Sequence, residues 1–210
     1  DKTGTITKGE MTVKQVFADE KMFDVSGAGY NADGIFSLDG KKHDVSRDKV
    51  LSLFCKAAVI CNDSSISRSG EGNDYTILGT PTEASLAVMA AKAGVFKDDL
   101  NSVRKAEIPF TSERKRMSVL ASLNKSNYVF TKGAPEVVLD FCTHVQRENG
   151  IFKLTSSQKN KILELMSSLN ARSYRTLAIA YSNSNKFEKE GEKNLVLLGI
   201  AALEDPPRAE

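Results

Sequence analysis

The chain has 210 residues, of which 40% are hydrophobic and 27% charged, a composition typical of globular proteins and unlike that of disordered or fibrous ones. Its 29 Lys and Arg residues nearly balance 27 Asp and Glu residues, and this net charge of +2 argues against a general nucleic-acid binder. The longest apolar stretches, Leu86–Ala91 and, across one glycine, Leu195–Leu203, are far shorter than the ~20 residues of a membrane-spanning helix.

The first fifth of the chain predicts a β-meander. A short polar segment rich in Thr and Gly, residues 1–10, precedes two predicted strands over Met11–Phe17 and Lys21–Ser26. The turn signal Asn31–Gly34 then leads into a third strand, Ile35–Leu38. We therefore expect these strands to pair as antiparallel neighbours.

Two helices follow, separated by a polar segment. Ser46 is expected to cap a helix over Arg47–Cys61, because apolar residues recur there at helical spacing. Residues 62–74 have too little apolar content for a core element and are predicted to form an exposed loop. The second helix start is better marked: Thr80 is the N-cap, Pro81 follows at the first helical position, and Glu83 is placed to complete a capping box. Gly94 is expected to end that helix.

The second half predicts five further strands and two helices. Three strand candidates separated by polar turns favour antiparallel hairpins. A short helix and then a longer one, capped by Thr155, are expected before the last two strands. The predicted strands are Val103–Phe110, Lys115–Leu123, Asn127–Lys132, Arg175–Tyr181 and Leu195–Leu203, and the short helix is Ala134–Phe141. Together these elements predict a mixed α/β (α+β) fold with a largely antiparallel sheet flanked by helices.

Glycine-rich nucleotide loops give no convincing match. Residues 27–32 fit the pattern G-x-G-x-x-A, but they lead into a turn and a strand where that motif needs a helix. Gly34 to Lys41 resembles a P-loop with one residue too many, and Lys42 stands where Ser or Thr is required. A bound nucleotide would therefore have to be held by side chains.

Metal and nucleophile patterns are equally sparse. The pair Cys142 and His144 is not a zinc site by itself, because zinc normally has four ligands. Cys55 and Cys61 fall on the apolar face of a predicted helix, so we interpret them as core residues. Three cysteines, an odd number, indicate a reducing compartment rather than a disulfide scaffold.

The strongest local signal is the first five residues, Asp1-Lys2-Thr3-Gly4-Thr5. A carboxylate can act as the nucleophile in phosphoryl transfer, and neighbouring ammonium and hydroxyl groups suit the incoming charge. Chemically, a polar stretch of five residues is more often a plain loop. As a string, however, DKTGT is the phosphorylation signature of the P-type ATPases, and this chain resembles that family.

The resemblance extends along almost the whole chain, in the family's own order. It is carried by Gly79–Glu83 (GTPTE), Pro109–Met117 (PFTSERKRM), Lys132–Glu136 (KGAPE), Arg175–Ala178 (RTLA) and Asp205–Arg208 (DPPR). Each string alone could arise by chance, but six in order make coincidence very improbable. The resemblance implies the nucleotide-binding domain fold of these pumps.

The resemblance also implies an ATP site. Phe110 would stack on adenine, Glu83 would contact its side, Lys132 would lie deep in the pocket near it, and Arg175 would face the phosphates. From the residues alone, Phe110 could equally be a core residue, Lys115 a solvated residue of a basic run, and Glu83 only a capping residue. The expected ATP-binding residues are Glu83, Phe110, Lys115, Met117, Lys132, Gly133, Ala134, Arg175 and Leu177.

Catalysis would involve the two ends of the chain. In the family, Asp1 would be phosphorylated with Lys2 and Thr3 beside it, and Asp1 and Thr3 would hold Mg²⁺ in the intact pump only. Residues 1–9 would then be an edge of the phosphorylation domain with the first hinge strand, and residues 10–203 would be the nucleotide-binding domain. Residues 204–210, with Asp205, Pro206, Pro207 and Arg208, would be the return hinge.

Because it starts at Asp1 rather than Met, we expect the chain to be a piece of a longer protein. The implied partners are ATP and the phosphorylation, actuator and transmembrane domains of the same full-length chain, at the cytosolic face of a membrane. The piece itself is expected to be soluble and monomeric, with no nucleic-acid partner. It is expected to bind ATP without hydrolysing it.

One departure from the family and two alternative functions stand beside this interpretation. Ser112 stands where the family often has Arg, which would either weaken the phosphate contacts or shift them to Arg114 or Arg175. Residues 61–64, 25–34 and GTPTEASL resemble calcium-transporting or closely related type II cation pumps more than heavy-metal pumps. The alternatives are a fragment of an aspartyl-phosphate phosphatase of the haloacid-dehalogenase kind, which would favour D-x-D over Asp1-x-Thr3, and an interaction module that binds no nucleotide.

Overall fold

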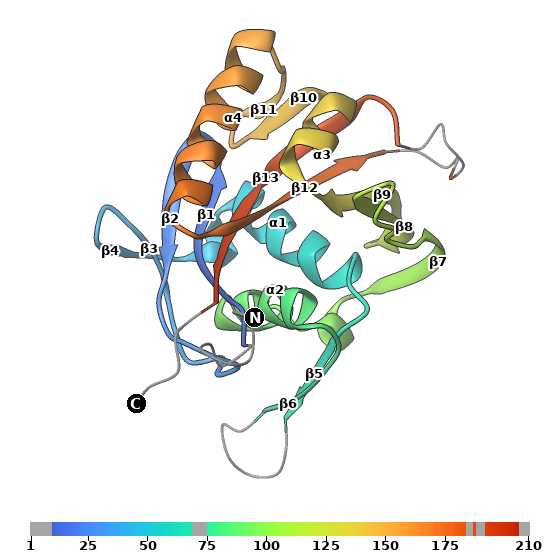
Figure 1. Ribbon diagram of the computed structural model, residues 1–210. Coiled ribbons are helices and arrows are strands. Elements are labelled where there is room, and N and C mark those ends of the chain that lie inside the picture. Colours follow the sequence, from blue (N-terminus) through green and yellow to red (C-terminus); the bar gives the residue numbers. More distant parts are fainter. Residues whose placement is uncertain (1–9, 69–74, 184–186, 188–191, 206–210) are drawn as a thin grey trace.

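The computed structural model describes residues 10–68, 75–183, 187 and 192–205. One large sheet occupies its centre, with helices on both faces, and a small hairpin extends from it (Figure 1). The strands are β1 (Thr12–Ala18), β2 (Lys21–Val25), β3 (Phe36–Leu38), β4 (Lys41–His43), β5 (Ser65–Arg68), β6 (Tyr75–Leu78), β7 (Ser102–Ile108), β8 (Arg116–Leu123), β9 (Ser126–Gly133), β10 (Cys142–Arg147), β11 (Gly150–Lys153), β12 (Arg175–Ser182) and β13 (Leu195–Glu204). The helices are α1 (Lys49–Ile60), α2 (Pro81–Lys92), α3 (Pro135–Phe141) and α4 (Ser156–Ala171), with short 3₁₀ turns η1 (Val45–Arg47) and η2 (Lys97–Asp99).

The large sheet has the strand order β4-β3-β2-β1-β13-β12-β9-β8-β7, with every pair along this path antiparallel. The hairpin β10–β11 joins it through a parallel pairing of β10 with β13. The predicted meander and the predicted series of hairpins over β7, β8 and β9 are both confirmed. The expected fold class, a largely antiparallel sheet flanked by helices, is confirmed with them.

The start of α1 differs from the prediction. The helix begins at Lys49 and not at Arg47, and its N-cap is Asp48 rather than Ser46. The Asp48 carboxylate accepts hydrogen bonds from the backbone N–H groups of Val50 and Leu51, at 3.0 and 2.9 Å. A side chain that satisfies two free N–H donors outcompetes a neighbouring serine for the cap position.

The polar segment after α1 is also more ordered than predicted. Within residues 62–74, expected to be an exposed loop, Ser65–Arg68 pairs with Tyr75–Leu78 as the antiparallel hairpin β5–β6. Low apolar content does not prevent this pairing, because backbone hydrogen bonds join the strands and Ile66 faces Ile77 across the ladder. Residues 69–74 lie outside the described part of the chain.

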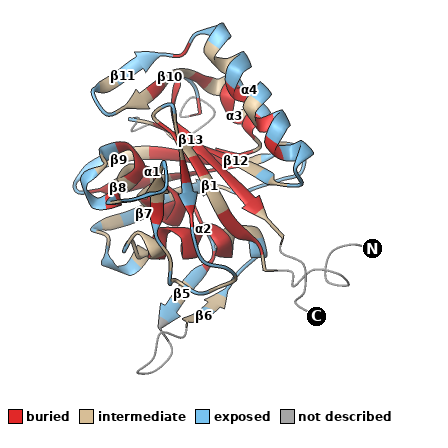
Figure 2. Ribbon diagram, turned by 90° about the vertical axis from the view of Figure 1, so that its left-hand side faces the viewer, coloured by how far each residue is buried: buried red, intermediate tan, exposed pale blue. Residues whose placement is uncertain are grey.

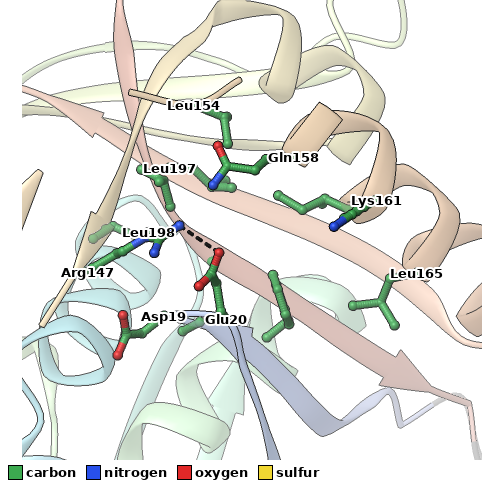
Figure 3. Close-up of a pocket in the computed structure, with 14 residues that line it drawn as sticks. Asp19, Glu20, Arg147, Leu154, Gln158, Lys161, Leu165, Leu197 and Leu198 are labelled. Carbon is green, nitrogen blue, oxygen red and sulfur yellow. Dashed lines mark hydrogen bonds and ion pairs between the residues drawn. The ribbon is translucent and has the colours of Figure 1, made fainter. Parts of the chain in front are cut away.

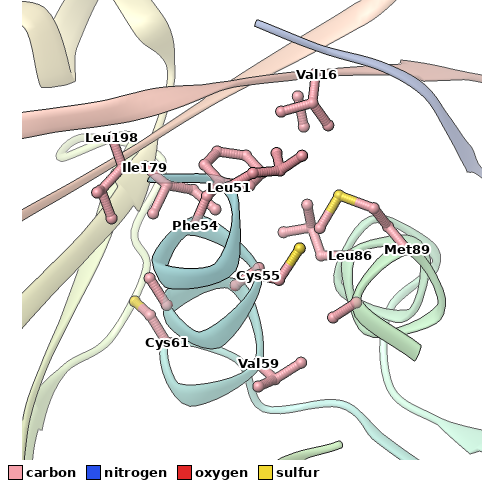
Figure 4. Packing of buried hydrophobic residues seen from close by; sticks show 14 of the residues in the cluster. Val16, Leu51, Phe54, Cys55, Val59, Cys61, Leu86, Met89, Ile179 and Leu198 are labelled. Carbon is pink, nitrogen blue, oxygen red and sulfur yellow. The ribbon is translucent and has the colours of Figure 1, made fainter. Parts of the chain in front are cut away.

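Two hydrophobic clusters cover the two faces of the sheet. On one face, α1 and α2 pack against side chains such as Val16, Ile179 and Leu198 from three neighbouring strands (Figure 4). On the other face, α3 and α4 pack against a second cluster. Buried residues are concentrated on the strands and on the helix sides that touch them, as Figure 2 shows. Nine of the ten residues of β13 are buried, so this strand is the centre of the fold.

The cysteines belong to this core. Cys55 and Cys61 have no exposed surface, which confirms the prediction that they are core residues, and Cys142 is buried as well. Burial raises the pKa of Cys55 to about 12 and that of Cys61 to about 11. Among the described residues, no helix is both long enough and apolar enough to cross a membrane.

Candidate functional site

A cleft of about 620 Å³ opens at one end of strands β8, β9 and β12. Helices from both faces of the sheet also begin or end there. The walls of the cleft come from the start of α2, the turn before β8, the junction of β9 with α3, the end of α4 and the start of β12. Eight of the nine expected ATP-binding residues line it: Glu83, Phe110, Met117, Lys132, Gly133, Ala134, Arg175 and Leu177.

Glu83 and Lys132 form a charged pair at the inner end of this cleft. The Lys132 Nζ atom lies 2.5 Å from Glu83 Oε1, and Lys132 is only 6% exposed. Glu83 Oε1 also accepts a hydrogen bond of 3.2 Å from the backbone N–H of Asp63. A lysine this deeply buried is rare unless it is paired, so the carboxylate is what keeps the ammonium in this position.

The predicted capping box at Glu83 is only half formed. Thr80 caps α2 as expected, because its hydroxyl accepts from the Glu83 backbone N–H at 3.4 Å. The Glu83 carboxylate does not return to the Thr80 backbone. It binds Lys132 instead, because a buried ammonium attracts a carboxylate more strongly than a neutral N–H does.

Phe110 and Met117 supply the apolar surface of the cleft. Phe110 is 58% exposed, on the turn between β7 and β8, so it is not a core residue. Met117, at the start of β8, is buried and belongs to the hydrophobic cluster around α1. An exposed aromatic ring next to a buried thioether gives the cleft a flat apolar face on which a planar ligand can stack.

Gly133 and Ala134 line the cleft, and the absence of a side chain at Gly133 makes room for the neighbouring strand. The space beside Gly133 is filled by protein backbone and not left open for a ligand. A Cβ atom at Gly133 would lie 2.4 Å from the Lys115 carbonyl oxygen and 2.6 Å from the Arg116 Cβ. The same Lys115 carbonyl accepts a hydrogen bond of 3.0 Å from the Ala134 N–H. The glycine is therefore required for the close packing of β9 against β8.

Lys115 is the one expected residue that does not line the cleft. It is exposed, with a positive φ of 51°, in the turn that precedes β8. Its backbone contributes to the site through the contact with Ala134. The contact with ATP expected for its side chain stays a prediction.

Arg175 and Leu177 form the wall contributed by β12. Arg175 is exposed at the first position of the strand, and Leu177 packs against the cluster around α1. Beside them, Asn170 near the end of α4 accepts a hydrogen bond of 3.3 Å from the Thr176 hydroxyl. Arg175 therefore presents a guanidinium at the rim of the cleft, where it can meet an anionic group.

Arg114, one of two residues expected to replace the arginine missing at Ser112, is already engaged. Its guanidinium pairs with Glu192, and Arg116 pairs with the same carboxylate at 2.9 Å. Of the two candidates, Arg175 lines the cleft and Arg114 does not.

The charges that line the cleft do not make it strongly positive. Two cations, Lys132 and Arg175, face three carboxylates, Asp63, Glu83 and Glu136. Asp63 is paired with Arg104 at 2.8 Å, and Glu83 is paired with Lys132. The cleft is thus electrostatically close to neutral, and apolar contact must contribute a large part of any ligand binding.

Sequence reasoning missed several residues that line the cleft. Five lie within motifs that it had identified, namely Thr80 and Thr82 of GTPTE, Pro135 and Glu136 of KGAPE, and Thr176 of RTLA. Asn170 and Tyr174 belong to no motif, although Tyr174 directly precedes RTLA. Their position depends on the end of α4 turning back toward β12, which a single segment does not encode.

The predicted catalytic end of the chain cannot be compared with the cleft. Asp1, Lys2 and Thr3 lie outside the described residues, and so do Pro206, Pro207 and Arg208 of the expected return hinge. Asp205 directly follows β13. Within the described ranges, no group of three or more His, Cys, Asp or Glu side chains could hold a metal ion.

A second, smaller cavity of about 290 Å³ lies beside the N-terminal half of α4 (Figure 3). It is lined mainly by apolar side chains, including Leu154, Leu165 and Leu197. At its mouth the Arg147 guanidinium lies 2.6 Å from Glu20. None of the residues expected to bind ATP lies in it.

A fold with a large antiparallel sheet between two helical layers, together with a mixed apolar and charged cleft, is consistent with the N domain of a P-type ATPase. The family described as P-type ATPase, cytoplasmic domain N, matches residues 50–210, and the chain belongs to this family.

Relatives agree with this assignment. The chain is 34% identical to a calcium-transporting ATPase of Bacillus subtilis over its whole length, 33% identical to the human calcium-transporting ATPase type 2C member 1 over 99% of its length, and 32% identical to the cation-transporting ATPase pma1 of Synechocystis over its whole length. It spans only 24%, 22% and 24% of these proteins, or about a quarter of each.

Proposed function

We propose that this chain binds ATP in the cleft at the end of the sheet, with the adenine ring stacked on Phe110. The observation that carries the proposal is that residues from four separated sequence motifs line one cleft, in a chain that belongs to the N-domain family. An exposed aromatic face contributes about 1–3 kcal/mol of base stacking where this has been measured. The near-neutral lining agrees with a ligand recognised mainly through its base.

The inner end of the cleft suits the polar edge of adenine. Adenine carries an amino donor next to ring-nitrogen acceptors. The Glu83 carboxylate can accept from the amino group, and the Lys132 ammonium can donate to a ring nitrogen. Arg175, at the rim, would then face the phosphates with a planar fork of donors.

In the full-length protein, we propose that this domain delivers the γ-phosphoryl group of ATP to Asp1 of the DKTGT motif during cation transport. The gain would be positional, because moving the domain brings phosphate and nucleophile together. The relatives named as calcium-transporting ATPases favour a calcium pump, with this domain on the cytosolic side of the membrane and the other domains of the same chain as its partners.

Mg²⁺ would act only in that intact enzyme. Asp1 and Thr3 offer the oxygen ligands that Mg²⁺ prefers, and the ion would neutralise charge on the transferred phosphoryl group. By the family resemblance, further carboxylates and a lysine from other parts of the full-length chain would complete the catalytic site. We therefore expect the chain to bind ATP largely independently of Mg²⁺ and not to hydrolyse it.

The first experiment is an NMR titration of the chain with ATP. We expect the amide signals of Phe110 and Lys132 to shift, and we expect Phe110→Ser to weaken ATP binding about tenfold, whereas Phe110→Tyr keeps the ring and binds within about twofold of wild type. Absence of any shift at millimolar ATP would favour the alternative of a nucleotide-independent interaction module. Equal ATP affinities for wild type, Phe110→Ser and Phe110→Tyr would show that Phe110 does not contribute to ATP binding.

The second experiment tests for phosphoryl transfer. After incubation with γ-labelled ATP, we expect no acid-stable label on Asp1. Label at Asp1 would show that the piece is catalytically complete, and hydrolysis of an added acyl phosphate would favour the alternative phosphatase of the haloacid-dehalogenase kind.

A further inference from the structure

Glu192 is a buried carboxylate outside every motif discussed so far, and its contacts lead to the turn that carries Phe110. Its side chain is only 5% exposed, although it lies in the segment that leads into β13. Burial by itself would raise the Glu192 pKa, but hydrogen bonds from Arg114, Ser118 and Arg116 outweigh it and lower the pKa below the usual value for Glu. The carboxylate is therefore ionised at neutral pH.

On one side, Glu192 is anchored to the rigid part of the sheet. Ser118 of β8 donates its hydroxyl to Glu192 Oε1 at 2.5 Å, and Ser118 also exchanges a hydrogen bond of 2.8 Å with Thr131 of β9. Arg116 donates to Oε2 at 2.9 Å, and the Arg116 guanidinium carbon lies 4.1 Å from the centre of the Phe141 ring. The position of the carboxylate is thus fixed by two central strands and by α3.

On the other side, Glu192 pairs with Arg114, and Arg114 hydrogen-bonds to the turn between β7 and β8. One terminal nitrogen of Arg114 pairs with Glu192 Oε1, and the other donates to the Pro109 carbonyl at 3.1 Å. Pro109 directly precedes Phe110. The Arg114 backbone N–H also donates to the Thr111 hydroxyl at 3.1 Å, which closes the turn on its other side.

We propose that Glu192 is a positioning residue of the nucleotide site, which fixes the Phe110 ring through Arg114 and the Pro109 carbonyl. The proposal rests on the proposed function, because it assumes that Phe110 stacks on the base. Binding is weakened by the entropy cost of ordering an exposed ring. A turn that is already held in place in the free protein reduces this cost. The ion pair with Glu192 also keeps Arg114 away from the phosphates. Breaking the pair would free Arg114 to contact them, so the effect on Phe110 must be measured with a ligand that has no phosphate.

Adenosine is therefore the ligand for the test, with affinities measured by NMR titration in four proteins: wild type, Glu192→Gln, Phe110→Ala and the double variant. We expect Glu192→Gln to weaken adenosine binding about five- to tenfold, roughly what loss of one ordinary hydrogen bond produces. In the Phe110→Ala background, Glu192→Gln should change the affinity less than twofold. A purely structural role would weaken binding equally in both backgrounds, and that result would overturn the proposal.

A second variant keeps the test decisive if Glu192→Gln does not fold. Arg114→Lys preserves the charge and leaves Glu192 paired with Arg116 and Ser118, but one ammonium cannot reproduce the fork that joins the carboxylate to the Pro109 carbonyl. We expect it to weaken adenosine binding about fivefold, again only when Phe110 is present. The matched control is Glu113→Gln, which removes an exposed carboxylate from the same turn and should leave adenosine binding within about twofold of wild type.

A fluorescence measurement separates this proposal from the proposed function. The chain contains no tryptophan, so Phe110→Trp introduces a single indole at the turn. In the ligand-free protein, Glu192→Gln should lower the fluorescence anisotropy of that indole, whereas unchanged anisotropy would overturn the proposal. If the wild-type chain bound no adenosine, the proposed function would fail together with the role of Glu192 in it. Normal wild-type binding that Glu192→Gln leaves unchanged would overturn only the role of Glu192.

Discussion

Removing the ammonium of Lys132 should destabilise the fold and weaken nucleotide binding at the same time. Lys132→Met keeps most of the side-chain volume but leaves Glu83 without its cation in a nearly enclosed position, where its side chain is 15% exposed. Breaking a buried pair in this way costs about 3–5 kcal/mol. Glu83 keeps the hydrogen bond from Asp63 and some contact with water, so we expect a smaller cost, about 2–3 kcal/mol.

This free energy corresponds to a fall in the midpoint of thermal unfolding of about 5–10 °C for a chain of this size. Circular dichroism during heating, together with urea denaturation, measures the change. The double variant Lys132→Met with Glu83→Gln contains no unpaired buried charge, so it should lose about 1–2 kcal/mol less than the two single variants combined. The matched control is Lys105→Met, which removes an exposed ammonium and should change the stability by less than about 0.5 kcal/mol.

Two results would refute this reasoning. If Lys132→Met were as stable as the Lys105→Met control, the pair would contribute nothing to the fold despite its burial. If the losses in the two single variants were strictly additive in the double variant, Lys132 and Glu83 would act independently, contrary to the 2.5 Å contact between them.

Two further predictions concern packing and pH. Gly133→Ala should destabilise the chain by about 1–3 kcal/mol, because the added methyl group has no space beside the backbone of Lys115, and an unchanged urea midpoint would contradict this packing. Burial, with a smaller contribution from Lys14, lowers the pKa of Lys92 to about 8, while its ammonium donates to the Ser26 carbonyl at 2.7 Å. The unfolded chain therefore holds more protons than the folded one between about pH 8 and pH 10.5, so the stability of wild type relative to Lys92→Met should rise with pH across this range. A difference in urea midpoints that stays constant across this range would show that Lys92 is not desolvated.

The elements best predicted from sequence are those whose signals are local. Thr80 caps α2 with Pro81 behind it, and Thr155 with Gln158 forms a complete capping box at the start of α4. Both features depend on residues within one helical turn of each other, so a short segment of sequence contains the whole signal. The hairpins of β7, β8 and β9 are local in the same sense, because their polar turns connect strands that are neighbours in the sheet.

The errors occurred where distant contacts choose between local alternatives. Asp44, Ser46 and Asp48 are all good capping residues, and the sequence does not indicate which of them begins α1. The capping box at Glu83 fails because Lys132, 49 residues away, competes for the carboxylate. Glu192 is the extreme case, since its partner Arg114 is 78 residues distant and the residues around it form no pattern.

The cleft owes its properties to its position at the ends of secondary-structure elements. Both helical layers stop there, α2 with its N-terminus on one face of the sheet and α4 with its C-terminus on the other. Side chains at such ends are held by rigid elements on one side only, so they can contact a ligand without disrupting the core.

Within the cleft, burial divides the contacts into two kinds. Met117 and Lys132 are fixed by the packing of central strands, whereas Phe110 and Arg175 lie at the rim, where no core holds them. A rim residue must be positioned by other means if it is to contribute to affinity. For Phe110 the available means is the chain of contacts from Glu192 through Arg114 to Pro109, which joins the exposed turn to strand β8.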